Sequence, residues 1–280
     1  MPVNPVPHGL HRDPGQVLWY DPAMPIVESR RACQSRACYK EHLHPTFSIG
    51  AIDAGQSTFT GADGGPVVLS PGTLVFVPAG RMHACNPASG SAWSYQMLHL
   101  DAEWLRGVRD EYCNEAKAKR EPVRIVTNPR LYAHFNRLNS LLFSDADPSD
   151  KEARLIEFIG DTETEQGRSI GPADIPQKLV EQIKPALEYL HKMPSESISL
   201  GELAGLVRLS RYQLIRAFRI VTGMTPHAWQ VNHRINLSRT LLRDGDSISS
   251  VALALGFADQ AHFQRAFKAH TGVTPGRFCT

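Results

Sequence analysis

The sequence has 280 residues, of which 42% are hydrophobic and 21% charged. This balance is typical of a folded protein and excludes a disordered or fibrous chain. Because single domains usually contain roughly 100–200 residues, the length predicts two domains. No apolar run approaches the ~18–20 residues that a bilayer span requires, and residues 1–15 lack the layout of a signal peptide. We therefore expect a cytoplasmic protein without membrane contact.

Positive charge is concentrated towards the end of the chain. Residues 1–170 contain 17 Lys and Arg against 20 Asp and Glu, whereas residues 171–280 contain 13 against 8. From Arg208 onward the counts are 10 against 3. A basic end on a nearly neutral chain is typical of a domain that binds phosphates, although an ordinary solvated surface would give the same counts.

The first half of the chain has the pattern of a β-rich domain followed by helices. Residues from about 28 to 100 contain short apolar or alternating segments, such as FSIGAI and TLVFVP, separated by turn residues. This spacing predicts a small antiparallel barrel or sandwich. Helical periodicity follows in segments that begin at Asp101, Pro129 and Asp150. The second of these carries an apolar stripe that fits either a core contact or a dimer seam: Leu131, Phe135, Leu138 and Leu142.

A polar segment rich in Gly and Pro, residues 162–176, is the best candidate for a linker. Placing the boundary there gives a β-rich domain with following helices at 1–165 and an all-helical domain at 176–280, so the predicted fold class is α+β. The helical domain is expected to begin with a helix at about 176–192, which Pro185 should weaken or kink.

The last eighty residues contain an internal repeat. The segment SRYQLIRAFRIVTGMTP, residues 210–226, aligns with DQAHFQRAFKAHTGVTP, residues 259–275, at an offset of 49. Each copy is predicted to be a short helix, a tight turn and a longer helix. The N-caps should be Ser199 and Ser210 in the first copy, and Ser247 and Asp259 in the second. From Pro226 to Gly245 we expect one long connecting helix.

On each longer helix, the face without core residues has the composition of a DNA-binding surface. Arg can bond a guanine edge, Gln an adenine edge, and flanking Arg or Lys a phosphate. A helical array with a merely hydrophilic outer surface is the alternative. The predicted DNA-binding residues are Arg211, Tyr212, Ile215, Arg216 and Arg219 in the first copy, and Gln260, Ala261, His262, Gln264, Arg265 and Lys268 in the second.

Residues 176–280, and above all the segment ALGFADQAHFQRAFKAHTGVTPGRF, resemble the DNA-binding domain of AraC/XylS-family transcription regulators. The resemblance implies two helix-turn-helix units that read adjacent major-groove segments. It also implies that base contacts fall on Tyr212, Ile215 and Arg216 of the first unit and on Gln260, His262, Gln264 and Arg265 of the second. The chain ends at GRFCT, where the family usually continues into a longer tail.

Two N-terminal segments, YKEHLHP and PGTLVFVPAGRMHACNP, resemble the two cupin motifs, which implies a cupin-like barrel that binds an effector. His42 and His44 match the paired histidines of the first motif, and His83 matches the second. Alternate strand residues point the same way, so the three side chains can converge. The carboxylate that normally follows the paired histidines is absent, which removes one metal ligand.

We therefore predict a regulator rather than an enzyme: a ligand-responsive activator, without a cofactor, whose effector pocket is lined by His42, His44 and His83. A metal-dependent cupin enzyme or a metal sensor that uses the same three histidines is the alternative. The expected partners are double-stranded DNA, a small-molecule effector and a second copy of the chain, with RNA polymerase as a further candidate.

Overall fold

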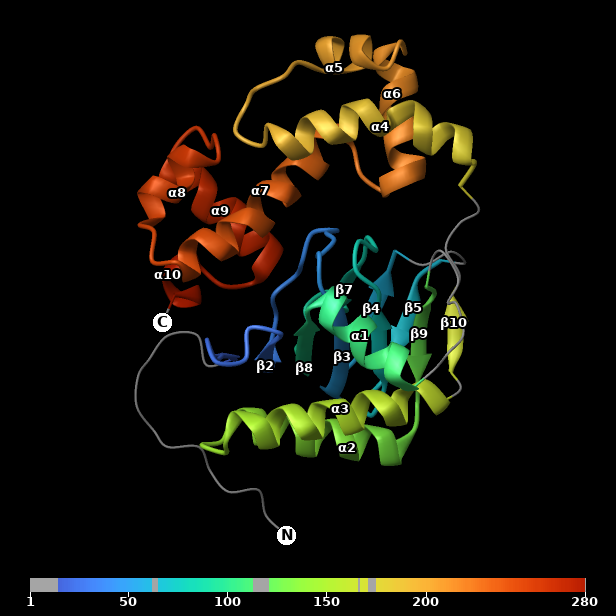
Figure 1. Ribbon diagram of the computed structural model, residues 1–280, viewed down its shortest axis with the longest axis vertical. Coiled ribbons are helices and arrows are strands. Elements are labelled where there is room, and N and C mark those ends of the chain that lie inside the picture. Colours follow the sequence, from blue (N-terminus) through green and yellow to red (C-terminus); the bar gives the residue numbers. More distant parts are fainter. Residues whose placement is uncertain (1–14, 62–64, 113–120, 166, 171–174, 280) are drawn as a thin grey trace.

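A computed structural model of the chain describes residues 15–61, 65–112, 121–165, 167–170 and 175–279 (Figure 1). The N-terminal part contains an antiparallel seven-stranded sheet in the order β1-β2-β8-β3-β6-β9-β10, and a three-stranded sheet in the order β5-β4-β7. The strands are β1 (Gln16–Tyr20), β2 (Val27–Ser35), β3 (Phe47–Ala54), β4 (Ser57–Thr60), β5 (Val67–Leu69), β6 (Leu74–Val77), β7 (Ala84–Pro87), β8 (Trp93–Leu100), β9 (Val123–Val126) and β10 (Arg168–Ile170).

The centre of the seven-stranded sheet is buried on both faces, as strand β6 illustrates. All four β6 residues are buried, and their side chains alternate between two apolar clusters. Leu74 and Phe76 face helices α1 (Ala102–Tyr112), α2 (Pro129–Leu142) and α3 (Pro148–Thr164), whereas Val75 and Val77 lie in the cluster shared with the smaller sheet. Within the described residues the two sheets do not close into a barrel.

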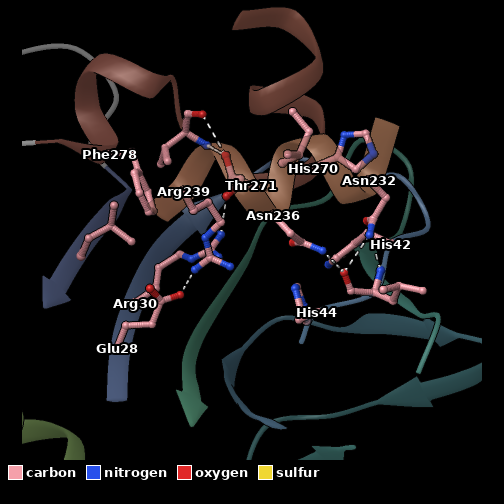
Figure 2. A pocket seen from close by; sticks show the side chains of 14 residues that line it. Glu28, Arg30, His42, His44, Asn232, Asn236, Arg239, His270, Thr271 and Phe278 are labelled. Carbon is pink, nitrogen blue, oxygen red and sulfur yellow. Dashed lines mark hydrogen bonds and ion pairs between the residues drawn. The ribbon is translucent and has the colours of Figure 1, made fainter. Parts of the chain in front are cut away.

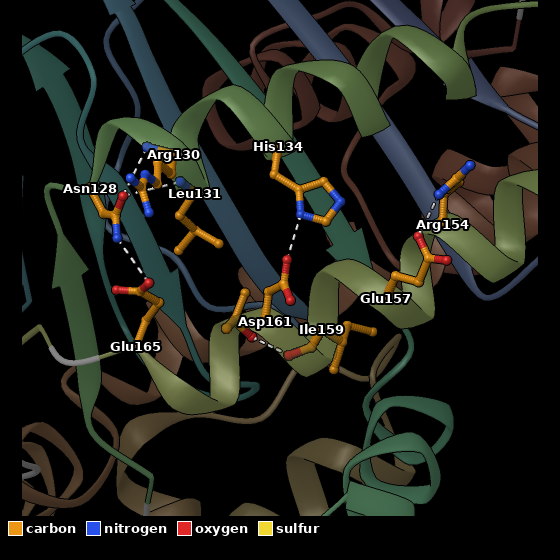
Figure 3. Close-up of polar contacts among 10 residues, drawn as sticks. Asn128, Arg130, Leu131, His134, Arg154, Glu157, Ile159, Asp161 and Glu165 are labelled. Carbon is orange, nitrogen blue, oxygen red and sulfur yellow. Dashed lines mark hydrogen bonds and ion pairs between the residues drawn. The ribbon is translucent and has the colours of Figure 1, made fainter.

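Helices α2 and α3 lie side by side against the large sheet (Figure 1). The predicted apolar stripe on α2 packs entirely into this core, where Phe135 and Leu142 are wholly buried. The core interpretation of that stripe is therefore the correct one, and a dimer seam would need another face. Polar contacts fix the pair: Asn128 caps α2 and donates to Glu165, and His134 pairs with Asp161 at 2.8 Å (Figure 3).

The remaining helices form the C-terminal part: α4 (Gln177–Lys192), α5 (Leu200–Leu206), α6 (Arg211–Thr222), α7 (Pro226–Arg243), α8 (Ile248–Ala254), α9 (Gln260–Thr271) and α10 (Pro275–Phe278). One apolar cluster joins α4, α5 and α6, and a second joins α7, α8 and α9. The long helix α7 connects them, as expected. Among the described residues, no helix has the length and apolar character of a membrane span.

The structure differs from the sequence-based expectations in three places. Strands β1 and β9 lie outside the region predicted to be extended, and β10 lies within the proposed linker, where it pairs with β9. Strands of three to five residues carry little periodicity, so their pairing depends on an available sheet edge rather than on local sequence. Helix α4 forms within the predicted range and contains Pro185 at an exposed position. Residues 166 and 171–174 of the proposed linker lie outside the described residues.

Candidate nucleic-acid interface and interdomain pocket

The two copies of the repeat fold into equivalent helix pairs. Helices α6 and α9 have twelve residues each and keep the offset of 49, while α5 and α8 keep an offset of 48. All four predicted N-caps form. Ser199 and Ser210 complete capping boxes with Glu202 and Gln213, and the side chains of Ser247 and Asp259 each accept a backbone N–H. The local sequence therefore fixes where each helix begins.

The inner face of each longer helix anchors it to its own helix pair. Leu214 and Phe218 of α6, and Phe263 and Phe267 of α9, are fully buried. This anchoring leaves the opposite faces open. Nine of the eleven predicted DNA-binding residues are exposed, including Tyr212 at 73%, and Ile215 and Gln264 are half-buried. The predicted faces are therefore accessible to a partner along both helices.

The C-terminal ends of α6 and α9, in contrast, contact the N-terminal part of the chain. Both helices end at a glycine with a left-handed backbone, Gly223 (φ +80°) and Gly272 (φ +79°). A β-carbon at Gly223 would lie 2.5 Å from Met82 Sδ, and one at Gly272 would lie 2.6 Å from the Tyr39 hydroxyl oxygen. Equivalent positions of the two repeats thus each contact a different loop of the N-terminal part.

A polar stripe on α7 contacts the N-terminal part of the chain. Asn232, Asn236, Arg239 and Arg243 are spaced four, three and four residues apart, so they share one face of the helix. The Leu43 N–H donates to Asn232 Oδ1, and the Leu43 carbonyl accepts from the Asn232 and Asn236 side chains. The Glu28 carboxylate accepts from Arg239 (Figure 2) and also from Arg243. Sequence reasoning missed this stripe, although its helical spacing was a usable signal.

A pocket lies between this stripe and the sheet domain (Figure 2). Its lining combines Glu28, Arg30, His42 and His44 of the sheet domain with Asn236 and His270 of the helical domain. The Arg30 guanidinium crosses the interface and donates to the Thr271 carbonyl at 2.6 Å. Two of the three predicted effector-binding residues therefore face a pocket shared by both parts of the chain. His83 lines a separate cavity inside the sheet domain.

The three predicted histidines are brought together. Each of His42, His44 and His83 has a ring nitrogen that could bind a metal, and these three nitrogens lie within 4.8 Å of one another. The ring centroids are 4.6 to 5.0 Å apart. His42 and His83 also form a backbone bridge, with N···O distances of 3.0 and 2.9 Å in the two directions. A fourth histidine, His99 on β8, was not predicted from the sequence. Its ring centroid lies 4.8 Å from that of His44.

Burial keeps these histidines neutral. Desolvation, reinforced by the neighbouring His83, lowers the pKa of His42 to about 3. Desolvation is also the main cause of the lowered pKa of His83 and of the strongly lowered pKa values of His44 and His99. Each ring therefore has one nitrogen with a free lone pair at neutral pH, which is the form that accepts hydrogen bonds or binds metals.

Comparison with known families decides the assignment. Residues 25–159 match the model of the AraC-like ligand-binding domain, and residues 203–280 match a helix-turn-helix domain model. The chain belongs to the AraC family of helix-turn-helix transcriptional regulators. It is a DNA-binding regulator with a ligand-binding domain, and not an enzyme, so the enzymatic cupin alternative is wrong.

Two similar proteins match most of the chain. The probable transcriptional regulator LumQ of Photobacterium leiognathi is 28% identical over 86% of this chain and 91% of its own length. The raffinose operon regulatory protein RafR of Pediococcus pentosaceus is 23% identical over 89% and 90%. Among solved structures, the apo form of a single-substitution variant of ToxT from Vibrio cholerae matches over 90% of this chain and 96% of its own, with a TM-score of 0.59 and 14% identity, a likeness of fold alone.

Proposed function

We propose that α6 and α9 enter adjacent major-groove segments of one DNA duplex and read bases through the eleven predicted residues. The observation that carries this proposal is the pairing of two equivalent helices, each buried on its apolar face and exposed on a face that carries Arg, Gln and His. The rigid connection through α7 would fix the two sites about one helical turn, ~34 Å, apart. Such contacts combine base readout with phosphate positioning.

The domain limits and the barrel form part of the same proposal. A sensor domain at 1–165 and a DNA-binding domain at 176–280 agree with the division of the apolar clusters, since two are built mainly from the strands and α1–α3 and two from α4–α10. The two sheets share one apolar cluster, and an isolated backbone bridge joins His42 and His83 in the segments between the strands. These contacts support an open, cupin-like relative of a barrel.

The effector is proposed to bind where the two parts of the chain meet. His42 and His44 face the interdomain pocket together with polar groups of α7, so a bound molecule would contact both domains at once. An effector can change the activity of a regulator only if it binds one domain arrangement better than another. A pocket built from both sides of an interface meets that condition directly. ToxT, for comparison, has been solved with an unsaturated fatty acid bound.

The remaining elements of the proposal concern partners. The protein would act in the cytoplasm as an activator, as a homodimer, with RNA polymerase as the candidate target of activation. Because the apolar stripe of α2 is used in the core, the dimer would form through other surfaces of the sensor domain.

Fluorescence anisotropy with a duplex selected from random sequences tests the proposal. We expect the full-length protein to bind the selected duplex at least ~10³ times more tightly than a scrambled one at the same salt concentration. Binding that is equal for both duplexes would contradict it. Candidate metabolites that raise the melting temperature of the protein would then be added, and an effector must shift the affinity for the selected duplex.

A further inference from the structure

We propose that His42, His44 and His83 form a binding site for one divalent transition-metal ion, and that this ion holds the sensor domain against the connecting helix α7. The second half of this statement rests on the proposed function, whereas the metal site itself does not.

The hydrogen bonds of two histidines orient them as metal ligands. His42 Nδ1 lies 2.6 Å from the Lys40 carbonyl oxygen, and His83 Nδ1 lies 2.9 Å from the Arg81 carbonyl oxygen. A carbonyl oxygen only accepts, so each Nδ1 must carry the hydrogen. The lone pair of each neutral ring is then on Nε2. Metal-binding histidines are typically held in this way, with the other ring nitrogen bonded to a backbone carbonyl.

His99 adds a second, independent observation. Its Nδ1 is 2.8 Å from Ser48 Oγ, while its Nε2 is buried without a hydrogen-bond partner, and the residue as a whole is only 3% exposed. A buried polar atom without a partner is costly. Because the His99 ring is 4.8 Å from that of His44, this nitrogen is available as a fourth ligand or as a partner for a metal-bound water.

The donor set selects the kind of ion. Three neutral imidazoles suit Zn²⁺, Co²⁺ and similar ions, whereas Mg²⁺ and Ca²⁺ prefer oxygen ligands. Arg30 shares the pocket with His42 and His44, and its positive charge opposes a bound cation. We therefore expect reversible binding that is weaker than that of a structural zinc site.

The site is connected to α7 through Leu43. His42 and His44 flank Leu43, whose N–H donates to Asn232 Oδ1 and whose carbonyl accepts from Asn232 and Asn236. In a tetrahedral zinc site with Zn–N bonds of 2.0–2.1 Å, ligand nitrogens are about 3.3 Å apart. The nitrogens here lie within 4.8 Å of one another, so binding would draw them together. It would thereby fix the backbone on both sides of Leu43.

Equilibrium dialysis of the full-length, chelator-treated protein against Zn²⁺, Co²⁺ or Mg²⁺ tests the site. We expect one Zn²⁺ or Co²⁺ per chain, a visible Co²⁺ spectrum without thiolate bands, and no stoichiometric Mg²⁺. His44→Gln and His83→Gln should each lower the affinity at least tenfold, while the control His227→Gln, at an exposed position on α7, should not. Melting temperatures without metal show that each variant folds.

Exposed cysteines provide a competing explanation that the same experiment can exclude. Cys33 and Cys38 are both exposed, and thiolates bind Zn²⁺ well. If the double variant Cys33→Ser, Cys38→Ser abolished binding while the histidine variants retained it, the proposed site would be refuted. Absence of stoichiometric Zn²⁺ and Co²⁺ from the wild-type protein would refute it equally.

The coupling has its own readouts. Zn²⁺ should slow hydrogen exchange of the Leu43 amide and change the affinity for the selected duplex on the order of fivefold or more. In Asn232→Ala the protein should still bind one ion, but both effects should disappear. Metal binding that leaves exchange and DNA affinity unchanged would contradict the coupling. If the metal-free protein failed to prefer the selected duplex at all, the proposed DNA-binding function would fail, and the dialysis result would still decide the metal site.

Discussion

Leu43 of the sheet domain and Asn232 of α7 are joined by two hydrogen bonds. Leu43 N donates to Asn232 Oδ1 at 3.3 Å, and Asn232 Nδ2 donates to Leu43 O at 3.1 Å. The Asn232 side chain, only 3% exposed, thus satisfies both backbone groups of one residue across the domain interface.

Asn232→Ala is expected to destabilise the folded protein by ~1–3 kcal/mol, because it leaves the Leu43 N–H without its partner. Chemical denaturation would measure the change in the free energy of unfolding. Asn236→Ala is the matched control: Asn236 donates to the Leu43 carbonyl at 3.2 Å, not to its N–H, and that carbonyl keeps the Asn232 bond. Equal losses in the two variants would show that the Leu43 N–H does not depend on Asn232.

The ion pairs of Glu28 with Arg239 and Arg243 are expected to stabilise the packing of α7 on the sheet domain. The carboxylate is 15% exposed and its partners 14% and 27%, so solvent screening is partial. Glu28→Gln should lower the free energy of unfolding by ~1–3 kcal/mol, with a smaller effect at high salt. A double-mutant cycle with Arg239→Gln measures the pairwise energy, and a coupling near zero would contradict the assignment.

Gly272 serves both a helix end and an interdomain contact, and Gly245 allows the two roles to be separated. Both have positive φ, but a β-carbon at Gly245 would meet nothing within 4 Å, whereas one at Gly272 would meet Tyr39. Gly245→Ala should therefore cost ~1–2 kcal/mol of stability from backbone conformation alone. Gly272→Ala should cost at least ~1 kcal/mol more. Thermal denaturation of the two variants checks this difference, and equal costs would contradict the contact with Tyr39.

Arg216 and Arg265 occupy equivalent positions of the repeat, and both are exposed. Alanine at either position should weaken binding to the selected duplex by ~1–3 kcal/mol and relax the preference at one or two base pairs. Lys184→Ala, on the exposed side of α4, is the control and should have little effect. A loss that is uniform over all duplexes, measured by competition binding, would mean that these arginines contact phosphates only.

The sequence predicted the helical domain in more detail than the sensor domain. N-caps such as Ser210 and Asp259 and the offset of the repeat are local signals. In the structure both caps form and the two helices have that offset. The convergence of His42, His44 and His83 followed from the resemblance to the cupin motifs. His99, and the contact between Leu43 and Asn232, depend on how distant segments pack, which local periodicity does not encode. The strand β10 was missed because its pairing with β9 comes from the open edge of a sheet.

The central claim is that two equivalent helices read two adjacent DNA segments. Selection from random duplexes by the wild-type protein, Arg216→Ala and Arg265→Ala tests it most directly. We expect the wild-type site to contain two conserved segments centred about 10 base pairs apart, and each variant to lose conservation in a different segment. A single conserved segment, or loss in the same segment with both variants, would contradict the account.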